Sequence, residues 1–153
     1  MDYIKKVEEF HKTFGAPVLE TPQIPSKERC DLRISLISEE LEEMKEAIEK
    51  GDVVEVADAI GDLIFVCFGS ILEFGMGDKF DKIFENIHNS NMSKACDSQK
   101  DALATLSHYK QKDGTEGVYK EENGKWLVYR KEDNKVLKSI NYSPANLKDI
   151  VNG

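Results

Sequence analysis

Two long helical patterns follow one another in this sequence, over residues 26–50 and 53–74. The first carries an apolar stripe with a period of about 3.6 residues, and the second is apolar through most of its length. Gly51, between them, is a residue type at which helices commonly end. Because so short a connection turns the chain back on itself, we expect the two helices to form an antiparallel pair.

Two further helical patterns flank this pair, over residues 2–14 and 78–89. The apolar residues that define them are Tyr3, Val7, Phe10 and Phe14 in the first, and Phe80, Ile83, Phe84 and Ile87 in the second. Four helices joined by short connections are typical of a bundle. The sequence therefore predicts an all-α core with the architecture of an antiparallel four-helix bundle.

The pattern changes after residue 89. Residues 100–111 predict a brief helix, and residues 117–140 alternate around the turn signals Asn123-Gly124 and Asp133-Asn134. We expect a small C-terminal β-ribbon, followed by a short final helix. Because such a ribbon is marginally stable alone, we expect residues 97–153 to form an extension packed on a helical domain of residues 1–96.

The charge of the chain narrows the classes of partner. A net charge of -8 argues against a nucleic acid or an anionic membrane as the main partner, since both reward clustered Lys and Arg. A chain of 153 residues is also small, and small subunits often complete their cores by assembly. We therefore expect no nucleic acid and no membrane partner, and a homodimer or homotetramer.

The cysteines and the apolar runs predict the compartment. The three cysteines at positions 30, 67 and 96 are widely spaced and include no C-x-x-C, so they indicate neither a disulfide framework nor a zinc site. The longest uncharged apolar run, residues 63–72, is far shorter than the ~18 residues that cross a bilayer. We expect a cytoplasmic protein.

Acidic residues interrupt the most apolar helix of the chain. At about 100° per residue, Glu55, Asp58 and Asp62 fall within an arc of about 60° on the helix of residues 53–74. On the preceding helix, Glu40 and Glu43 lie one turn apart, and Glu39 lies slightly further round. If the two helices pack antiparallel through their apolar stripes, these carboxylates converge.

Converging carboxylates need compensation, because an ionised carboxylate without a partner in a site poor in water costs several kcal/mol. Arg33, two turns before Glu40, could neutralise one acid but hardly all of them. The alternatives are protonation or a divalent cation, and ligands that are all oxygen favour Mg²⁺ or Mn²⁺. For acids in the run EELEEMKE, such as Glu42 and Glu46, a solvated helix face is the simpler interpretation.

These stretches resemble a known superfamily. EELEE followed by EVADAIGDLIFV is similar to the E-E-x-x-E and E-x-x-D signature of the all-α nucleoside triphosphate pyrophosphohydrolases. That superfamily includes MazG enzymes, dimeric dUTPases and phosphoribosyl-ATP pyrophosphohydrolases. The stretches FHKTFGAPV, LRISLISEE, IHNSNMSK and DNKVLKSINYSPANL sharpen the resemblance to its small MazG-like members. The resemblance covers most of the chain except about residues 97–130.

The resemblance implies a hydrolase that cleaves a nucleoside triphosphate to the monophosphate and pyrophosphate with the help of Mg²⁺, in a housekeeping role in the nucleotide pool. It implies Glu40, Glu43 and Asp62 as metal ligands and Glu39 as the residue that orients or deprotonates the attacking water. The active site would lie in the domain of residues 1–96. No phosphate-binding glycine loop and no nucleophile signature occurs, which leaves metal-assisted attack by water.

One position departs from the signature. Ala59 stands where members commonly have a glutamate, three residues before the aspartate that corresponds to Asp62. We expect Asp58, one turn before Asp62, to take the place of the missing ligand, with Glu55 in support.

The triphosphate also requires cationic contacts. Lys94 and Lys138 are the candidates, and Asn91 is a candidate to hydrogen-bond the base or the sugar. The simpler interpretation places Lys94 at a solvated bend and gives Asn91 a role in shaping the turn. Two other functions stay open: hydrolysis of phosphoribosyl-ATP in histidine biosynthesis, and an acidic helical module that binds a partner without catalysis.

Overall fold

The computed structural model describes residues 2–153, and the chain divides into two compact units. One unit runs to Phe80 and includes Val151–Gly153, and the other comprises Asp81–Ile150. Helices predominate, and the described residues contain one two-stranded antiparallel sheet. The prediction of a helical protein with a small C-terminal β-ribbon is therefore confirmed. The four-helix bundle stays a prediction, as does the division of the chain at residue 96.

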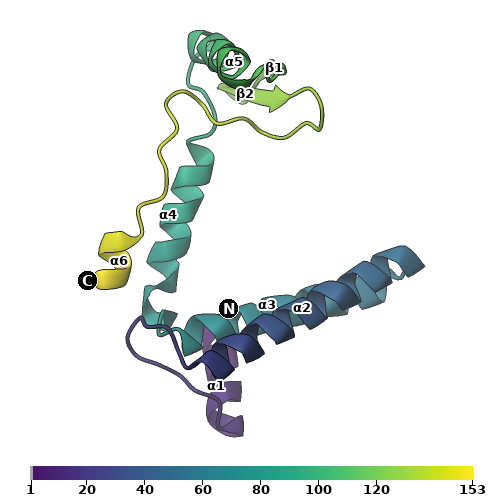
Figure 1. Ribbon diagram of the computed structural model, residues 1–153, viewed down its shortest axis with the longest axis vertical. Helices are drawn as coiled ribbons and strands as arrows, with labels where there is room; N and C mark the ends of the chain where they lie inside the picture. Colours follow the sequence, from purple (N-terminus) through teal and green to yellow (C-terminus); the bar gives the residue numbers. More distant parts are fainter. Residues whose placement is uncertain (1) are drawn as a thin grey trace. The chain divides into compact units, whose positions relative to one another are not determined.

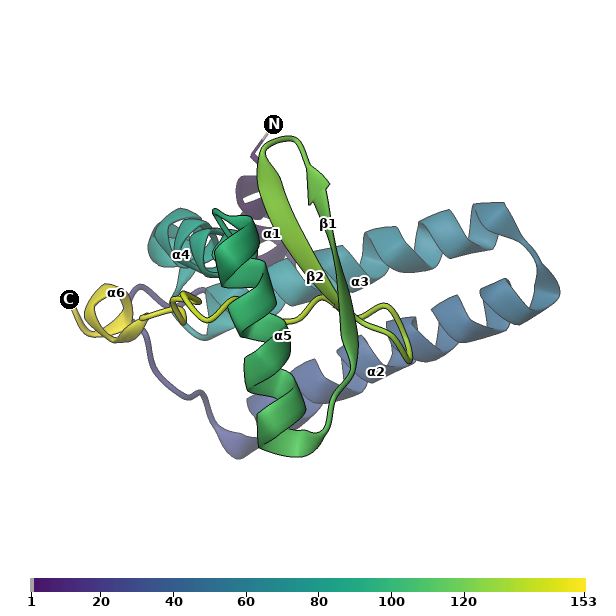
Figure 2. The same cartoon turned by 90° about the horizontal axis from the view of Figure 1, so that it is seen from above.

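The first unit is built on a helical hairpin. Helix α2 (Lys27–Lys50) and helix α3 (Val53–Glu73) lie side by side and antiparallel (Figures 1 and 2). Gly51 ends α2 in the left-handed region at φ 69°, and its N–H donates to the carbonyls of Ala47 and Ile48. The side chain of Asp52 then caps α3 by accepting from the N–H groups of Val54 and Glu55. Two adjacent residues thus end one helix and begin the next.

Small side chains lie inside this hairpin. Ala47 of α2 is 4% exposed and Ala59 of α3 is 3% exposed. Helix α1 (Tyr3–Phe14) packs against α3, where Phe10 meets Phe65 edge to face with ring centroids 5.3 Å apart. The unit thereby buries small side chains between α2 and α3 and aromatic side chains between α1 and α3.

A buried ionic cluster joins the start of α2 to the end of α3. Glu73 is 0% exposed, and its carboxylate accepts from Arg29 Nε at 2.9 Å and pairs with Arg33 Nη2 at 2.5 Å. Removing one partner of a buried pair costs roughly 3–5 kcal/mol, because it leaves an uncompensated charge. The cluster therefore fixes how the two helices are aligned.

Gly69 makes room for this cluster on α3. A Cβ atom at Gly69 would lie 2.6 Å from Arg33 Nη1 and 2.9 Å from Nε2 of His11, which is buried. The other ring nitrogen of His11, Nδ1, donates to the carbonyl of Pro17 at 2.8 Å. Side chains from α1 and α2 thus meet over a position of α3 that has no side chain of its own.

The second unit contains α4 (Phe80–Met92) from Asp81 onward, α5 (Gln99–Asp113), β1 (Gly117–Glu122) and β2 (Lys125–Arg130). The short 3₁₀ helix of Gly77–Lys79 precedes α4, and α6 (Lys148–Asn152) follows near the end of the chain. Asn123 and Gly124 both have positive φ, at 53° and 76°, which is the conformation of a two-residue hairpin turn. The predicted Asn-Gly turn is confirmed.

The ribbon packs against α5, and the two form a small core. Cys96, Ala102, Val128 and Leu137 form a buried cluster in which Ala102 comes from α5 and Val128 from β2. A two-stranded sheet of this size needs such a packing partner. The extension is therefore built around its own small core.

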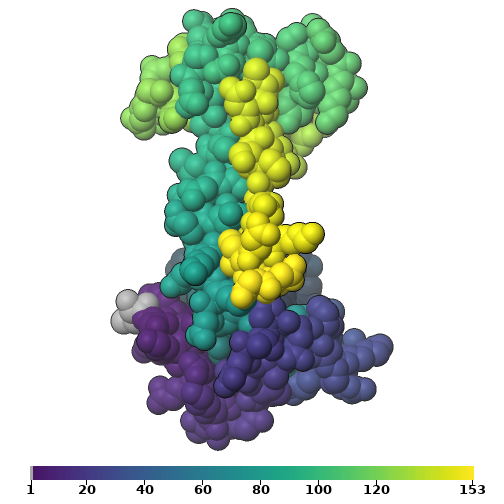
Figure 3. Space-filling model, turned by 90° about the vertical axis from the view of Figure 1, so that its left-hand side faces the viewer, coloured from purple at the N-terminus to yellow at the C-terminus, as the bar shows by residue number. Residues whose placement is uncertain are grey.

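The chain after the ribbon returns along α4, where the segment near the C-terminus lies against the helix (Figure 3). Ser139 N donates to the carbonyl of Lys94 at 3.2 Å, and Ser143 N donates to Ser93 Oγ at 3.0 Å.

No single helix within residues 2–153 combines the length and the apolarity that crossing a membrane requires. Helix α3 and residues 77–92 meet the length and apolarity criteria only when they are taken together, as a pair with a sharp bend between them.

We predict that Gly69→Ala destabilises the fold by about 1–3 kcal/mol, because the added methyl group would collide with Arg33 and His11. Gly61→Ala is the matched control on the same helix, since a Cβ atom there meets nothing within 4 Å. Alanine at position 61 should be neutral or stabilising by up to about 1 kcal/mol. Urea denaturation of both variants measures the difference, and equal stabilities would contradict the packing described here.

Candidate active site

Glu40 lies at the centre of the acidic face of the hairpin. It is half-buried, and its Oε2 atom is buried without a hydrogen-bond partner in the part of the chain that the structure describes. Buried carboxylate oxygens normally accept hydrogen bonds, and leaving one unpaired is costly. The side chain thus has an unused acceptor at a position poor in water.

The negative charges of four other carboxylates act on Glu40. Desolvation raises the pKa of the Glu40 carboxyl, and the negative charges of Glu43, Asp62, Glu39 and Asp58 raise it further. Two of these residues come from α2 and two from α3. The acids of the two predicted helices therefore act on one another, as the antiparallel pairing requires.

The helical repeat accounts for this arrangement. Glu40 and Glu43 are one turn apart on α2, and Asp58 and Asp62 are one turn apart on α3, so each helix presents a pair on one side. Ala59, next to Asp58, is buried. A buried alanine contributes no ligand, so Asp58 and Asp62 are the acids that this part of α3 offers.

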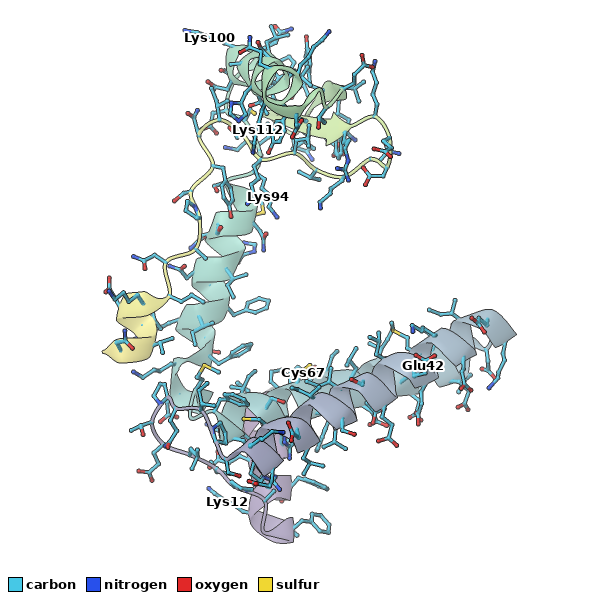
Figure 4. All side chains as sticks on the ribbon, in the orientation of Figure 1. Lys12, Glu42, Cys67, Lys94, Lys100 and Lys112 are labelled. Atoms are coloured by element: carbon cyan, nitrogen blue, oxygen red, sulfur yellow. The ribbon has the colours of Figure 1, made fainter. Side chains whose placement is uncertain are left out.

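Not all the acidic residues join this group. Glu55, in the first turn of α3, is not among the charges that act on Glu40. It is exposed, as are Glu39, Glu43, Asp58 and Asp62, and the roles of all these acids stay predictions. Glu42 and Glu46 are exposed and pair with Lys45 at 2.7 Å and Lys50 at 3.0 Å along α2, as a solvated face requires. Figure 4 labels Glu42 on this helix.

Arg33 pairs with Glu73, not with the acids around Glu40. The prediction that Arg33 could neutralise one of those acids is therefore wrong. The sequence reasoning missed Glu73, although a glutamate that ends a long apolar run is itself a signal of a buried pair.

The donor chemistry of the cluster suits a hard divalent cation. Within residues 2–153, no three His, Cys, Asp or Glu side chains are close enough to hold a metal ion as they stand. The side chains are nevertheless carboxylates alone, and one buried oxygen has no partner. Carboxylate oxygens are the ligands that Mg²⁺ and Mn²⁺ prefer, so the residues fit such an ion.

The second unit brings the predicted substrate-binding residues together. Lys94, after the end of α4, donates to Asn91 Oδ1 at 2.6 Å (Figure 4). Lys138 Nζ lies 4.3 Å from the ring centroid of Tyr142, whose hydroxyl is 3.0 Å from Ser90 Oγ. The sequence reasoning did not single out Tyr142, which stands four residues after Lys138 in a stretch already noted for its resemblance.

Comparison with known proteins gives two matches. Residues 7–91, more than half of the chain, match the family described as phosphoribosyl-ATP pyrophosphohydrolase. The chain is also similar to the uncharacterized protein L479 of Acanthamoeba polyphaga mimivirus, with 23% identity in an alignment that covers 73% of this chain and 78% of the relative. The family match includes every acid of the cluster and Asn91, and it ends before Lys94 and Lys138.

We predict that Glu40→Gln raises the melting temperature at pH 7 in the absence of divalent cations. The folded-state pKa of Glu40 is raised, so ionisation favours the unfolded chain, and this penalty develops as the pH rises through the unfolded value of about 4.3. Glutamine removes the charge and with it the penalty. The gain should disappear below about pH 4, where the wild-type carboxyl is protonated in both states.

Glu46→Gln is the matched control, since Glu46 is an exposed glutamate of the same helix that pairs with Lys50. This change should cost about 0.3–0.5 kcal/mol at pH 7. Thermal melts of the three proteins at pH 7 and pH 4 in EDTA provide the test. A lower melting temperature for Glu40→Gln than for the wild type at pH 7 would contradict the repulsion inferred here.

Proposed function

Because this chain belongs to the phosphoribosyl-ATP pyrophosphohydrolase family of the MazG-like all-α superfamily, we propose that it is a Mg²⁺-dependent nucleoside triphosphate pyrophosphohydrolase. Membership of the family indicates a hydrolase that acts on pyrophosphate bonds. The observation that carries the proposal is the half-buried Glu40, with an oxygen that has no partner and with acids of both helices around it.

In the proposed reaction, water attacks the α-phosphorus of the nucleotide, and the bond from this phosphorus to the bridging oxygen of the β-phosphate breaks. The products are the nucleoside monophosphate and pyrophosphate. Glu39 accepts or orients the proton of the attacking water. Its charge is among those that act on Glu40, which supports a role next to the ligands.

Glu40, Glu43, Asp58 and Asp62 would hold the divalent ions, with Glu55 in support. Bound Mg²⁺ would supply neutralisation of phosphate charge and a lowered pKa for water. The carboxylates themselves gain from such ions, because the repulsion that raises the pKa of Glu40 is then offset.

Lys94 and Lys138 would bind the phosphates, and Asn91 would donate a hydrogen bond to the base or the sugar. The Oδ1 atom of Asn91 already accepts from Lys94, which leaves the NH₂ group of its amide to donate to a ligand. Asn91 is the last residue of the family match, whereas Lys94 and Lys138 lie beyond it. The proposal therefore includes residues outside the match.

Two substrate classes suit the proposal. One is a group of unwanted nucleoside triphosphates, which would make the protein a housekeeping enzyme of the nucleotide pool. The other is phosphoribosyl-ATP, which the description of the matching family favours. Pyrophosphate release from dUTP, dCTP, the standard and oxidised triphosphates and phosphoribosyl-ATP would rank them.

We also propose that the protein is a homodimer or homotetramer, with a second copy completing a four-helix bundle. Large apolar side chains of both hairpin helices are at least 40% exposed: Leu32, Ile34, Leu41 and Ile48 on α2, and Val53, Val54, Ile60 and Ile64 on α3. Monomeric proteins seldom expose so many apolar side chains on neighbouring helices.

Ile64→Glu should therefore yield a smaller assembly, because it places a charge on the apolar face of α3. Ile24→Glu is the matched control, since Ile24 is 78% exposed in the loop before α2 and lies outside the hairpin. Sedimentation analysis at micromolar concentration reports the masses. A monomeric wild-type protein would contradict the assembly.

Asp62→Asn should lower kcat/KM by roughly 100-fold or more, because the loss of a ligand removes several kcal/mol of charge stabilisation in the transition state. Mg²⁺ should also raise the melting temperature of the wild-type protein, and the variant should show a smaller rise. Asp31→Asn is the matched control, since Asp31 is an exposed aspartate of α2 that pairs with Lys27. Full activity of Asp62→Asn at saturating Mg²⁺ would contradict the ligand assignment.

A further inference from the structure

Lys94 and Lys138 are two of several lysines of the second unit that have no acidic partner within the described residues, although the chain is acidic. The net charge is -8, and many Lys and Arg side chains pair with carboxylates. Within the described residues, the ammonium group of Lys94 donates to the side-chain amide of Asn91. The ammonium group of Lys138 lies over the ring of Tyr142. No carboxylate of the described residues therefore occupies either ammonium group.

Tyr142 is held in place by hydrogen bonds that also connect its segment to the backbone of Lys94. The N–H of Tyr142 donates to the carbonyl of Ser139 at 2.9 Å, and Ser139 N donates to the carbonyl of Lys94. The Tyr142 hydroxyl is 3.0 Å from Ser90 Oγ on α4. The backbone that carries Lys94 and the phenol beside Lys138 therefore belong to one hydrogen-bonded arrangement.

The charges of both lysines reach the phenol. The hydrogen bond with Ser90 lowers the pKa of Tyr142, and the positive charges of Lys138 and Lys94 lower it further. If Ser90 donates to Tyr142, the phenolic O–H is left to donate to a ligand. Two ammonium groups and one phenolic donor are the groups that bind a phosphate.

We propose that Lys94, Lys138 and Tyr142 form a phosphate-binding site, in which the hydroxyl of Tyr142 donates to a phosphate oxygen and its ring positions the ammonium group of Lys138. The inference rests on the proposed function in one respect, since it adds Tyr142 to the residues that bind the phosphates of the nucleotide. The ligand class is a di- or triphosphate, either free pyrophosphate or the phosphate chain of a nucleotide.

Binding of pyrophosphate in EDTA, measured by calorimetry, tests this site without the acidic cluster. Tyr142→Phe keeps the ring beside Lys138 and removes the donor, so it should weaken binding roughly 10-fold or more. Lys138→Gln should weaken binding and reduce its dependence on salt. Ser90→Ala removes the same internal hydrogen bond and keeps the phenol, so it should retain most of the binding.

The chain offers a matched control pair in β1 and β2. Lys120 Nζ lies 5.6 Å from the ring centroid of Tyr129, but Lys120 also pairs with Glu122 at 2.6 Å. Tyr129→Phe and Lys120→Gln should therefore leave pyrophosphate binding unchanged. Circular dichroism and melting temperatures of all variants separate lost binding from lost folding.

Three outcomes decide the matter. Equal pyrophosphate affinity for the wild type, Tyr142→Phe and Lys138→Gln would overturn the phosphate site, and equal losses for Ser90→Ala and Tyr142→Phe would reduce Tyr142 to a structural role. Binding that depends on Tyr142, in a protein that turns over no nucleotide, would support the site and contradict the proposed function.

In an active enzyme, Tyr142→Phe should raise KM more than it lowers kcat. A nucleotide analogue that binds more tightly than pyrophosphate identifies the nucleotide as the source of the phosphate.

Discussion

The alignment of α2 and α3 depends on one buried carboxylate. Glu73 has no access to solvent and is paired with Arg29 and Arg33, which lie one turn apart on α2. A buried charge is stable only while its partners stay in place, so this cluster holds the two helices in one register. The positions of the acids in the middle of the hairpin follow from that register.

The hairpin contains two acidic sites that differ in how their negative charge is compensated. At one end, two arginines neutralise Glu73, and one of them, Arg33, has space only because position 69 is a glycine. In the middle, Glu40 is surrounded by carboxylates, and its buried oxygen has no partner. A contrast between a buried acid that two arginines neutralise and an acid that has only like charges around it is typical of a site that binds a ligand.

Local chemistry was sufficient to predict the elements. The glycine and aspartate between α2 and α3, and the Asn-Gly turn between β1 and β2, act through their own backbone conformations, so the sequence reveals them. The convergence of Glu40 and Asp62 also followed from helical spacing. The pairing of Arg29 with Glu73 spans 44 residues and that of Ser90 with Tyr142 spans 52, and no local period encodes such contacts. For this reason the partners of Glu73 and Tyr142 are revealed only by the structure.

The burial of Ala59 constrains how this chain can change over evolutionary time. A larger residue at position 59 would separate two helices that approach each other through small side chains at positions 47 and 59. Reverting alanine to the glutamate common in the superfamily would thus require a compensating change on α2. Two coupled substitutions are rarer than one, so we expect a lineage with alanine at position 59 to keep it, and with it any ligand role that Asp58 has.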